Sequence, residues 1–559
     1  MKKRLISILV ALAVVASAFS GCNTDDGGSS TAGTASSGAE SVVESSAASE
    51  EEASSEASEK DADEDKETPD GEVEELTVMV WDRGNAAPNT SNEDNPLTDY
   101  IKERVLEEAN VDVSYMIVPR SGSDDKLNVM MAGGNAPGIV FSYDQAIFTN
   151  YAANGGLADL TDAMDTYGDQ IREYIGEVQH MGEFEGKQYA VMKQRADSAS
   201  RHVQYIRKDW LDKLGMEVPS TKEELFKALH AFKDENPGEV ANPIPWMMSG
   251  VIDTEKNYLN FVGSYTAPFD DSNKKEQFVY SENYIIFREG GIEGIRKMNE
   301  LYNDGLIYND FVSDTTEDML RQEISNGNVG FVLADRTWPW EFFEPMQEAV
   351  PGAEFEAVST LELSDGSYRN PAEPLHGMFV MVPENRSDMA NAAMRYLNWM
   401  ADPQVAEDIS YTPGHEVTPE GVPIRPLEDE LHALGYPGTP ADLDIINDHL
   451  PYTETRDGLV TALMLGNAPF AERPWYEHAY DIIYEDGYFV YDSYPAVIEA
   501  EAEYGANVKN MAVEYVYKLI CCAPEEFDAL QKTEYDKLVS AGLEKIFEER
   551  AAWYDENVG

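Results

Sequence analysis

The sequence predicts an α/β protein with at least two lobes and a helical C-terminal part. Short β-type runs alternate with helical runs from residue 76 onward, which is the pattern of α/β architectures. About 485 residues lie beyond residue 75 and 42% of the chain is hydrophobic, so we expect a large core and more than one lobe. Apolar residues recur at spacings of three and four between residues 507 and 553, which predicts mostly helical structure there.

The first elements of this pattern follow one another closely. Short β-type runs predict strands at 76–80 and 111–117, and helical spacing of apolar residues predicts a helix at 97–109. A short apolar run at 139–141 predicts a further buried strand. These four segments begin the alternation that indicates the fold class.

A helix start is signalled near residue 220. The tetrapeptide Ser-Thr-Lys-Glu at 220–223 is interpreted as a capping box, and Pro219 precedes it. The apolar residues that follow share one helical face: Leu225, Phe226, Leu229 and Phe232. A helix with such a face is expected to pack against a core.

Later segments predict two strands and a break between helices. Residues 329–333 and 378–382 are predicted strands, and residues 389–400 a helix. This helix runs up to Asp402-Pro403, where proline imposes a break. Proline can begin the next helix there, because its missing N–H is not needed in the first turn.

The first residues predict export and a lipid anchor. Three basic residues at 2–4 precede an apolar run at 5–18, which is too short for a usual membrane span. Small residues then lead into Cys22, which resembles the lipobox of bacterial lipoproteins, although Phe19 stands where a smaller aliphatic residue is usual. The resemblance implies that residues 1–21 are a signal peptide and that acylated Cys22 holds the protein at the extracellular face of the cell membrane. The alternative is an ordinary signal peptide followed by an incidental cysteine.

Residues 22–75 are predicted to form a disordered acidic linker. They consist almost wholly of Ser, Ala, Gly, Thr, Glu and Asp and contain no aromatic residue. Such a composition buries too little apolar surface to offset the chain entropy, and its like charges repel. We assign the segment the role of a tether and no binding role.

The charge balance excludes two kinds of partner. The chain has 41 basic and 105 acidic residues and a formal net charge of −64. Nucleic acids and anionic lipid surfaces are recognised by basic surfaces, so neither is expected as a partner. We interpret the acidity as a solvated surface that keeps an exported protein soluble.

Disulfides are not expected to hold the fold together. Apart from Cys22, the only cysteines are Cys521 and Cys522. A bond between neighbouring cysteines closes a strained ring, so two reduced, partly buried thiols on a helix are predicted.

Several motifs occur in an order that resembles a known family. Residues 126–140 are similar to that family's helix, small-residue loop and strand, and residues 186–191 followed by 205–215 to its most recognisable block. Residues 327–331 and 396–400 are similar to its later strand and helix. In this order the motifs resemble the extracellular solute-binding lipoproteins of bacterial ABC transporters, family 1, of the sugar-binding type.

The resemblance implies a two-lobed, periplasmic-binding-protein-like (type II) fold with a ligand cleft between the lobes. It implies a monomeric substrate-binding lipoprotein that captures an oligosaccharide or related sugar and delivers it to ABC permease subunits, without a cofactor or catalysis. Extended stretches at 189–195 and 376–380 are predicted to cross between the lobes, where small φ/ψ changes swing whole lobes. The expected boundaries are 76–195 with 378–450 for the first lobe and 196–377 with 451–559 for the second.

Residue types at strand ends indicate where a sugar would bind. A sugar ring offers apolar C–H faces and a rim of hydroxyls, so its site needs flat aromatic rings and side chains with paired donors or acceptors. In α/β proteins such groups gather in loops at the carboxyl ends of strands. The candidates chosen on this ground are Trp81, Asp82, Arg83, Tyr143, Asp144, Asp335, Arg336 and Trp338, with Arg195, Trp246, Glu416 and Trp475 as weaker candidates.

The candidates also have structural interpretations. Ligand contact and core packing are weighed equally for Trp81 and Trp338, whereas packing is favoured for Trp246 and Trp475. Asp82 and Arg83 could form an exposed ion pair of little energetic value.

Other function classes find less support in the sequence. A secreted glycoside hydrolase needs paired carboxylates, but with 105 acidic residues such pairs carry no information. The sequence contains no Gly-x-Ser-x-Gly elbow, no His-Glu-x-x-His, no phosphate-binding loop and no EF-hand loop that would support a calcium site. We therefore do not expect an enzyme, and the sequence neither supports nor excludes a calcium site. The remaining alternative ligand is a peptide or another small polar solute.

Overall fold

The computed structural model describes residues 72–196, 202–251, 258–335, 339–368, 370–419, 421–424, 426–450, 460, 478–479, 481–482, 488–489, 494 and 496–559. The predicted signal peptide, Cys22 and almost all of the predicted linker lie outside these residues, as do Arg336, Trp338 and Trp475. Within them, no helix combines the length and the apolar character that a membrane crossing requires.

The first sheet consists of two parallel strands joined by a helix. β1 (Glu74–Asp82) pairs along its whole length with β2 (Val111–Pro119), and α1 (Pro96–Ala109) connects them. The predictions of these two strands and of the helix are confirmed. β1 is longer than predicted, so Trp81 and Asp82 are its last residues and do not follow it.

A second sheet contains three antiparallel strands in the order β3 (Val140–Ser142), β12 (His376–Met381) and β6 (Ala190–Gln194). The strands predicted at 139–141 and 378–382 are confirmed, the first shifted by one residue and the second by up to two. One buried hydrophobic core joins both sheets to their helices and draws its residues from 76–192 and 378–446.

The predicted helix break is also confirmed. α13 (Ala390–Met400) is followed by α14 (Pro403–Tyr411), which begins at the proline. The Asp402 side chain accepts the N–H of Gln404 at 2.9 Å and so caps the second helix.

A third sheet is built from residues between β6 and β12. Its strands lie in the order β10 (Phe355–Val358), β7 (His202–Arg207), β9 (Val329–Asp335) and β8 (Ile244–Met247). β7 is antiparallel to both β10 and β9, whereas β8 is parallel to β9. The strand predicted at 329–333 is confirmed, and β9 is two residues longer.

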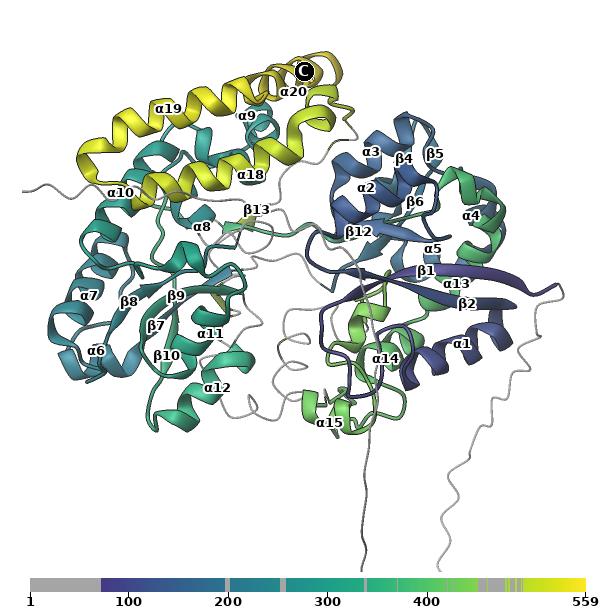
Figure 1. Ribbon diagram of the computed structural model, residues 1–559, viewed down its shortest axis with the longest axis horizontal. Helices are drawn as coiled ribbons and strands as arrows, with labels where there is room; N and C mark the ends of the chain where they lie inside the picture. The colour runs from purple at the N-terminus through teal and green to yellow at the C-terminus, as the bar shows by residue number, and fades with distance from the viewer. Residues whose placement is uncertain are drawn as a thin grey trace, which may run out of the picture. The chain divides into compact units, whose positions relative to one another are not determined.

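Helices cover both faces of this third sheet, because its strands alternate buried residues between the faces. Ile206 and Phe331 belong to the core shared with α6 (Lys208–Leu214) and α7 (Lys222–Glu235). Tyr205 and Val332 belong to a second core, to which α11 (Asp318–Ser325) and α12 (Pro339–Ala349) contribute. Figure 1 shows the two pairs of helices on opposite sides of the strands.

The start of α7 differs from the predicted capping box by one residue. Thr221 is the N-cap and accepts the N–H of Glu224, and the Glu224 carboxylate accepts the N–H of Ser220 at 2.9 Å. The acidic residue of the cap is therefore Glu224 and not Glu223, because it lies three residues after the N-cap Thr221, and its carboxylate reaches the residue before the N-cap.

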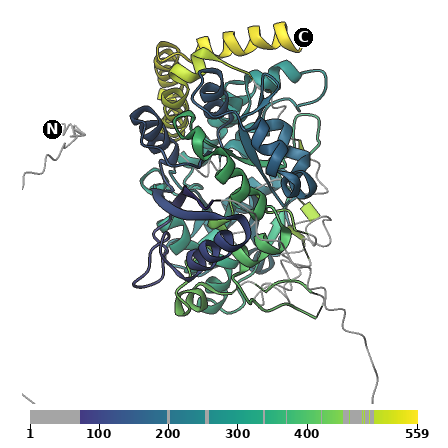
Figure 2. The ribbon, with the colours of Figure 1, turned by 90° about the vertical axis from the view of Figure 1, so that its right-hand side faces the viewer.

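The C-terminal part is helical, as predicted. α18 (Glu499–Cys521), α19 (Phe527–Ser540) and α20 (Leu543–Asn557) pack beside one another, and α18 also packs on α10 (Gly291–Asn303) (Figures 1 and 2). Cys521 and Cys522, at the end of α18, form no disulfide and are half-buried, in agreement with the prediction of two partly buried thiols on a helix.

Three chain segments meet at Gln194, the last residue of β6. Gln194 pairs with His376 of β12 on one side and forms a parallel bridge to Asn447 on the other. The Gln194 N–H donates to Ile446 O at 2.9 Å, and Gln194 O accepts the N–H of Asp448 at 2.9 Å. The two stretches predicted as crossings are thus neighbouring strands, and the segment around Asn447 is a third partner that the sequence did not predict.

The remaining α-helices and strands of the described residues are short. They are α2 (Ser123–Gly133), α3 (Gln145–Ala153), α4 (Thr161–Tyr167), α5 (Asp169–Ile175), β4 (Glu183–Phe184), β5 (Lys187–Gln188), α8 (Tyr258–Gly263), α9 (Lys274–Val279), β11 (Asn370–Pro371), α15 (Glu428–Ala433) and β13 (Tyr488–Phe489).

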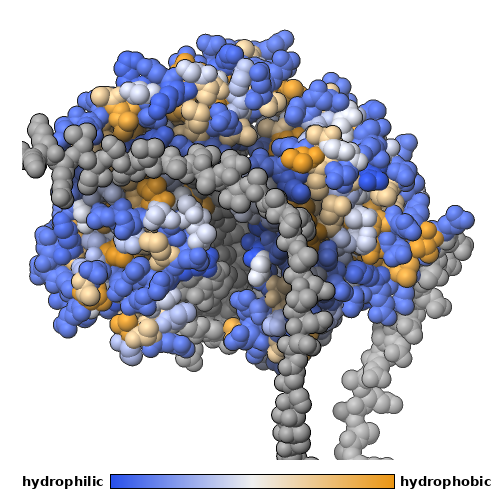
Figure 3. Space-filling view, in the orientation of Figure 1, coloured by the Kyte–Doolittle hydropathy of each residue, from blue (hydrophilic) through white to orange (hydrophobic). Residues whose placement is uncertain are grey.

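Figure 3 shows that the visible face carries mainly hydrophilic side chains with apolar residues in small patches, in agreement with the excess of charge.

Candidate functional site

An aromatic pair stands at the carboxyl ends of β1 and β3. The Trp81 and Tyr143 rings stack with centroids 5.9 Å apart and planes at 27°, and Trp81 meets Phe141 edge-on at 5.0 Å. Trp81 is only 5% exposed, whereas Tyr143 is 40% exposed. Trp81 is therefore mainly a packing residue, and Tyr143 offers the exposed aromatic surface.

Three arginines surround this aromatic pair. The Arg120 guanidinium lies 4.1 Å from the centroid of Trp81, Arg83 lies 5.9 Å from the same ring, and Arg195 lies 5.1 Å from the centroid of Tyr143. Arg120 follows the last residue of β2, and its N–H donates to Asp82 O at 2.9 Å, which extends the β1–β2 ladder by one bond. The cluster thus combines a flat apolar surface with several hydrogen-bond donors, as a sugar site requires.

The arginines differ in their acidic partners. Arg83 forms two hydrogen bonds to the Asp442 carboxylate, one of them Nη2 to Oδ1 at 2.9 Å. Arg195 pairs with Glu373 at 3.2 Å. Burial lowers the pKa of Arg120, and the positive charge of Arg83 lowers it further. The structure therefore gives Arg83 the partner Asp442, which the sequence had not suggested.

The two aspartates predicted for the site have local structural roles. Asp82 Oδ1 accepts the N–H of Gly84 at 2.8 Å and so shapes the turn after β1. Asp144 caps α3 by accepting the N–H of Ala146 at 2.8 Å, and its other oxygen pairs with Lys509 of α18 at 3.0 Å. Burial raises the pKa of Asp144, but Lys509 and the capping N–H groups lower it more, so the net pKa is below its usual value.

Two weaker candidates lie apart from this cluster. Trp246 is completely buried and belongs to β8, where it packs on Phe261 and Phe331 at centroid distances of 5.1 and 5.5 Å. The predicted loop is therefore a strand, and the burial of the ring agrees with the packing role that was favoured for Trp246 from the sequence. Glu416 is exposed in the segment after α14, and no contact in the described part of the chain joins it to Trp81 or Tyr143.

Four predicted residues remain without a described side chain. Asp335 is the last residue of β9, at the carboxyl end predicted for it, but only its backbone is described. The side chains of Arg336, Trp338 and Trp475 lie outside the described residues.

A buried ionic group lies beside the cluster, where the three chain segments meet. Lys193 Nζ donates to Asp444 O at 2.7 Å and pairs with Asp448 at 2.9 Å. Burial raises the pKa of Asp444 to about 7, although Lys193 opposes the shift. Burial, Arg195 and His180 together lower the pKa of His376 to about 4.

Sequence reasoning missed Arg120, Asp442, Lys193 and Lys509. Only Arg120 had a usable signal, because it directly follows a strand that is parallel to β1, and the ends of parallel strands meet at one edge of a sheet. Lys193 lies in β6, inside the extended stretch predicted at 189–195, but nothing in that stretch marks the lysine as a buried ion-pair partner. Lys509 belongs to the helix α18, and Asp442 to a segment with no strand pattern.

Among the described residues, no group of three or more His, Cys, Asp or Glu side chains is arranged to hold a metal ion. The two hollows along α18 are lined by none of the predicted residues.

The chain belongs to the family of bacterial extracellular solute-binding proteins, whose model matches residues 102–419. It is 24% identical to the polygalacturonan/rhamnogalacturonan-binding protein YtcQ of Bacillus subtilis, over 42% of this chain and 47% of YtcQ. It is 28% identical to the diacetylchitobiose-binding protein DasA of Streptomyces coelicolor, over 40% of this chain and 47% of DasA. The chain thus spans about half the length of the curated relatives it matches.

The fold is that of the two-lobed solute-binding proteins. The alginate-binding protein AlgQ2, crystallised without calcium ion, superposes with a TM-score of 0.62 over 87% of this chain and 98% of AlgQ2, at 16% identity. The predicted α/β fold class and the resemblance to solute-binding proteins are therefore confirmed. The family is one of binding proteins, which agrees with the expectation that the chain is not an enzyme.

Proposed function

We propose that this protein is the substrate-binding lipoprotein of an ABC importer and that it captures an oligosaccharide or a related sugar. The observation that carries the proposal is the Tyr143 ring, which is 40% exposed, stacks on Trp81 and lies 5.1 Å from the Arg195 guanidinium, with Arg120 over the neighbouring Trp81 ring. An aromatic face stacks on the C–H groups of a sugar ring, and guanidinium groups donate to its hydroxyls. The relatives named for polygalacturonan and diacetylchitobiose support a saccharide as the ligand.

The mechanism proposed is closure of two lobes around the ligand. The cores drawn from 76–192 with 378–446 and from 206–361 with 500–547 would be the two moving bodies, with the segments at Gln194 as the hinge. A ligand that contacts both lobes favours the closed state by the difference between its affinities for the two states. In this proposal Asp335, Arg336 and Trp338, and more weakly Trp475, supply the second wall of the cleft.

The proposal also covers where the protein is held and how it delivers its ligand. Cys22 would carry the lipid anchor at the extracellular face of the membrane, and the linker at 22–75 would give the binding part reach. The closed form would then be recognised by the permease subunits. The family's extracellular setting supports this arrangement.

The proposal is tested by ligand screening of the purified full-length chain. Thermal-shift and calorimetric titrations would use monosaccharides, oligosaccharides from two to six units, and short peptides at matched concentrations. We expect an oligosaccharide to raise the melting temperature and to bind with a stoichiometry of one. A response to peptides alone would contradict the sugar assignment, and hydrolysis of a bound glycan would contradict the assignment as a binding protein.

A further inference from the structure

Arg120 differs from its two neighbouring arginines because it forms no ion pair with a described carboxylate. Arg83 and Arg195 each pair with a carboxylate, Asp442 and Glu373 respectively. Among the residues the structure describes, the Arg120 guanidinium has no acidic side chain within ion-pair distance, and its buried Nε has no hydrogen-bond partner. The charges of Asp442 and Asp124 act on Arg120, but neither carboxylate forms an ion pair with it. In a chain with 105 acidic and 41 basic residues, a half-buried arginine without an ion-paired carboxylate needs an explanation.

The position of Arg120 is fixed from both sides. Its N–H is held by Asp82 O at 2.9 Å, and its guanidinium lies 4.1 Å from the centroid of Trp81. Trp81 in turn stacks on Tyr143, whose ring also lies beneath Arg195. The planar donor group is thus held over Trp81, the inner ring of the proposed sugar platform, and its rotamers are restricted before any ligand arrives.

Stacking on Trp81 satisfies the apolar face of the guanidinium but none of its N–H donors. A buried donor without an acceptor costs free energy, and arginine prefers to pair both N–H groups of its fork with a planar anion. A carboxylate supplied by the ligand meets that need. A neutral hydroxyl would meet it only in part.

We infer that the ligand is an acidic oligosaccharide, whose sugar ring stacks on Tyr143 while its carboxylate pairs with Arg120. This inference rests on the proposed function, because it assumes that the Trp81–Tyr143 pair is the sugar platform. The ligand class is a uronic-acid oligomer, since a uronate carries its carboxylate on the ring that is stacked. Arg195 binds the same ring from the Tyr143 side and keeps Glu373 as its own partner.

The test compares ligands of equal size that differ only in charge. Calorimetric titration of the full-length chain would use oligogalacturonates of two to four units and their fully methyl-esterified forms, with neutral galacto-oligosaccharides of the same length. We expect the free acid to bind about ten- to a hundredfold more tightly than its ester, the range for a hydrogen bond to a charged group. The preference should shrink as sodium chloride is raised.

Variants of Arg120 test whether this side chain causes the preference for the free acid over its methyl ester. Arg120→Met should remove most of the preference for the acid and leave the weaker affinity for the ester, while Arg120→Lys should keep part of it because the charge remains. The control is Arg104→Met, which removes an arginine that stacks on Tyr100 at 5.5 Å and pairs with Glu108 on α1. This control should leave both affinities unchanged. The melting temperature of each variant is measured, so that a loss of fold is not read as a loss of recognition.

The outcomes separate this inference from the proposed function. Equal affinity for the acid, the ester and the neutral oligosaccharide overturns the inference and leaves the proposed function standing. A preference for the acid that survives in Arg120→Met also overturns it, because another group then reads the charge. Binding of no sugar of any kind overturns the proposed function and this inference together.

Discussion

Tyr143 stacks on Trp81 with ring centroids 5.9 Å apart, and the two chain segments that carry these residues are joined by a parallel bridge between Val78 and Ile139. Trp81 is buried and Tyr143 is 40% exposed, so the pair forms a platform with one inner and one outer ring. The inner ring fixes the orientation of the outer one. This division of roles leads to different predictions for the two residues.

Replacing Tyr143 by Ala should weaken sugar binding and leave stability nearly unchanged. The exposed ring offers stacking surface that the fold does not need, and loss of such stacking costs about 1 to 3 kcal/mol of binding free energy, a range measured for nucleic-acid bases. The measurement is calorimetric titration with the ligand found in the screen. Tyr143→Phe serves as control and should retain most of the affinity, whereas an unaltered affinity in Tyr143→Ala would remove this residue from the site.

Replacing Trp81 by Ala should mainly destabilise the fold. The ring packs against Phe141, Tyr143 and Arg120, and truncation of a buried tryptophan costs about 3 to 5 kcal/mol of unfolding free energy. Urea denaturation followed by tryptophan fluorescence and circular dichroism measures this change. A variant of wild-type stability that has lost affinity would instead make Trp81 a direct ligand contact.

His376 should make the protein less stable in mild acid. Burial and the nearby Arg195 lower its pKa to about 4, from 6.5 when free, so the unfolded chain binds a proton more readily. The free energy of unfolding therefore falls as the pH drops from about 6.5 to about 4, by about 1 to 2 kcal/mol for this partly exposed ring. Denaturation of His376→Gln over this range should show a flatter profile than the wild type. Parallel profiles would show that His376 does not titrate as expected.

Asp444 should make the protein less stable as the pH rises, which is opposite to the effect of His376. Burial raises its pKa to about 7 from 3.8, so the folded state holds the proton more tightly than the unfolded state. The free energy of unfolding therefore falls as the pH rises from about 4 to about 7, by about 1 to 3 kcal/mol. Asp444→Asn removes this titration, so its stability relative to the wild type should increase between about pH 4 and about pH 7. A difference that does not change with pH would contradict the assignment.

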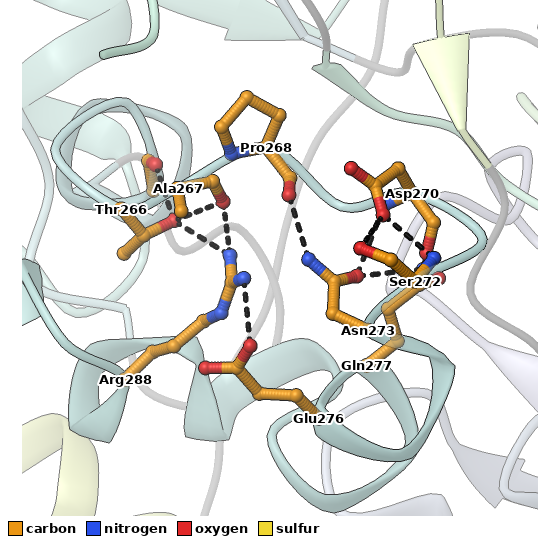
Figure 4. Close-up of polar contacts among 10 residues, drawn as sticks. Thr266, Ala267, Pro268, Asp270, Ser272, Asn273, Glu276, Gln277 and Arg288 are labelled. Carbon is orange, nitrogen blue, oxygen red and sulfur yellow. Dashed lines mark hydrogen bonds and ion pairs between the residues drawn. The ribbon is translucent and has the colours of Figure 1, made fainter. Parts of the chain in front are cut away.

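Arg288 should be important for the fold of the region between α8 and α10. Its side chain is 2% exposed, pairs with Glu276 at 3.0 Å, donates to Thr266 and Ala267, and lies 4.0 Å from the centroid of Phe269. Figure 4 shows the guanidinium between the Thr266–Ala267 backbone and Glu276, next to the turn held by Asp270 and Asn273. Arg288→Met should cost about 2 to 4 kcal/mol of unfolding free energy.

Arg296→Met is the matched control for Arg288. Arg296 also stacks on an aromatic ring, Phe527 at 4.2 Å, and also pairs with a carboxylate, Asp528 at 2.7 Å, but its side chain is 42% exposed. Its loss should cost less than about 1 kcal/mol, because water screens the exposed pair. Equal losses in the two variants would show that burial is not what makes Arg288 important.

The sequence predicted those parts of the fold that depend on local periodicity. β1, β2, α1 and the restart of a helix at Pro403 carry strand or helix signals within their own residues, and all were found. The capping box was displaced by one residue, because two neighbouring hydroxyl residues offer the same local signal. The short strand β8 was missed, because proline-rich segments of four residues favour loops in isolation.

The candidate site was predicted only in part, for a physical reason. Trp81, Tyr143 and Arg195 were chosen because they lie at strand ends, and the fold brings them together. Which ring faces solvent depends on packing between strands distant in sequence, so Trp81 could not be told from Tyr143. Partners such as Asp442 reach the site from segments more than 300 residues away, and no local pattern announces them.

A crystal structure of the full-length chain with its tightest-binding oligosaccharide tests the central claim most directly. The account predicts one sugar ring stacked at about 4 Å on the exposed face of Tyr143, with Arg195 and Arg120 hydrogen-bonded to the same ring and residues from the third sheet on its other side. A saccharide bound elsewhere, with Tyr143 left bare, would contradict it.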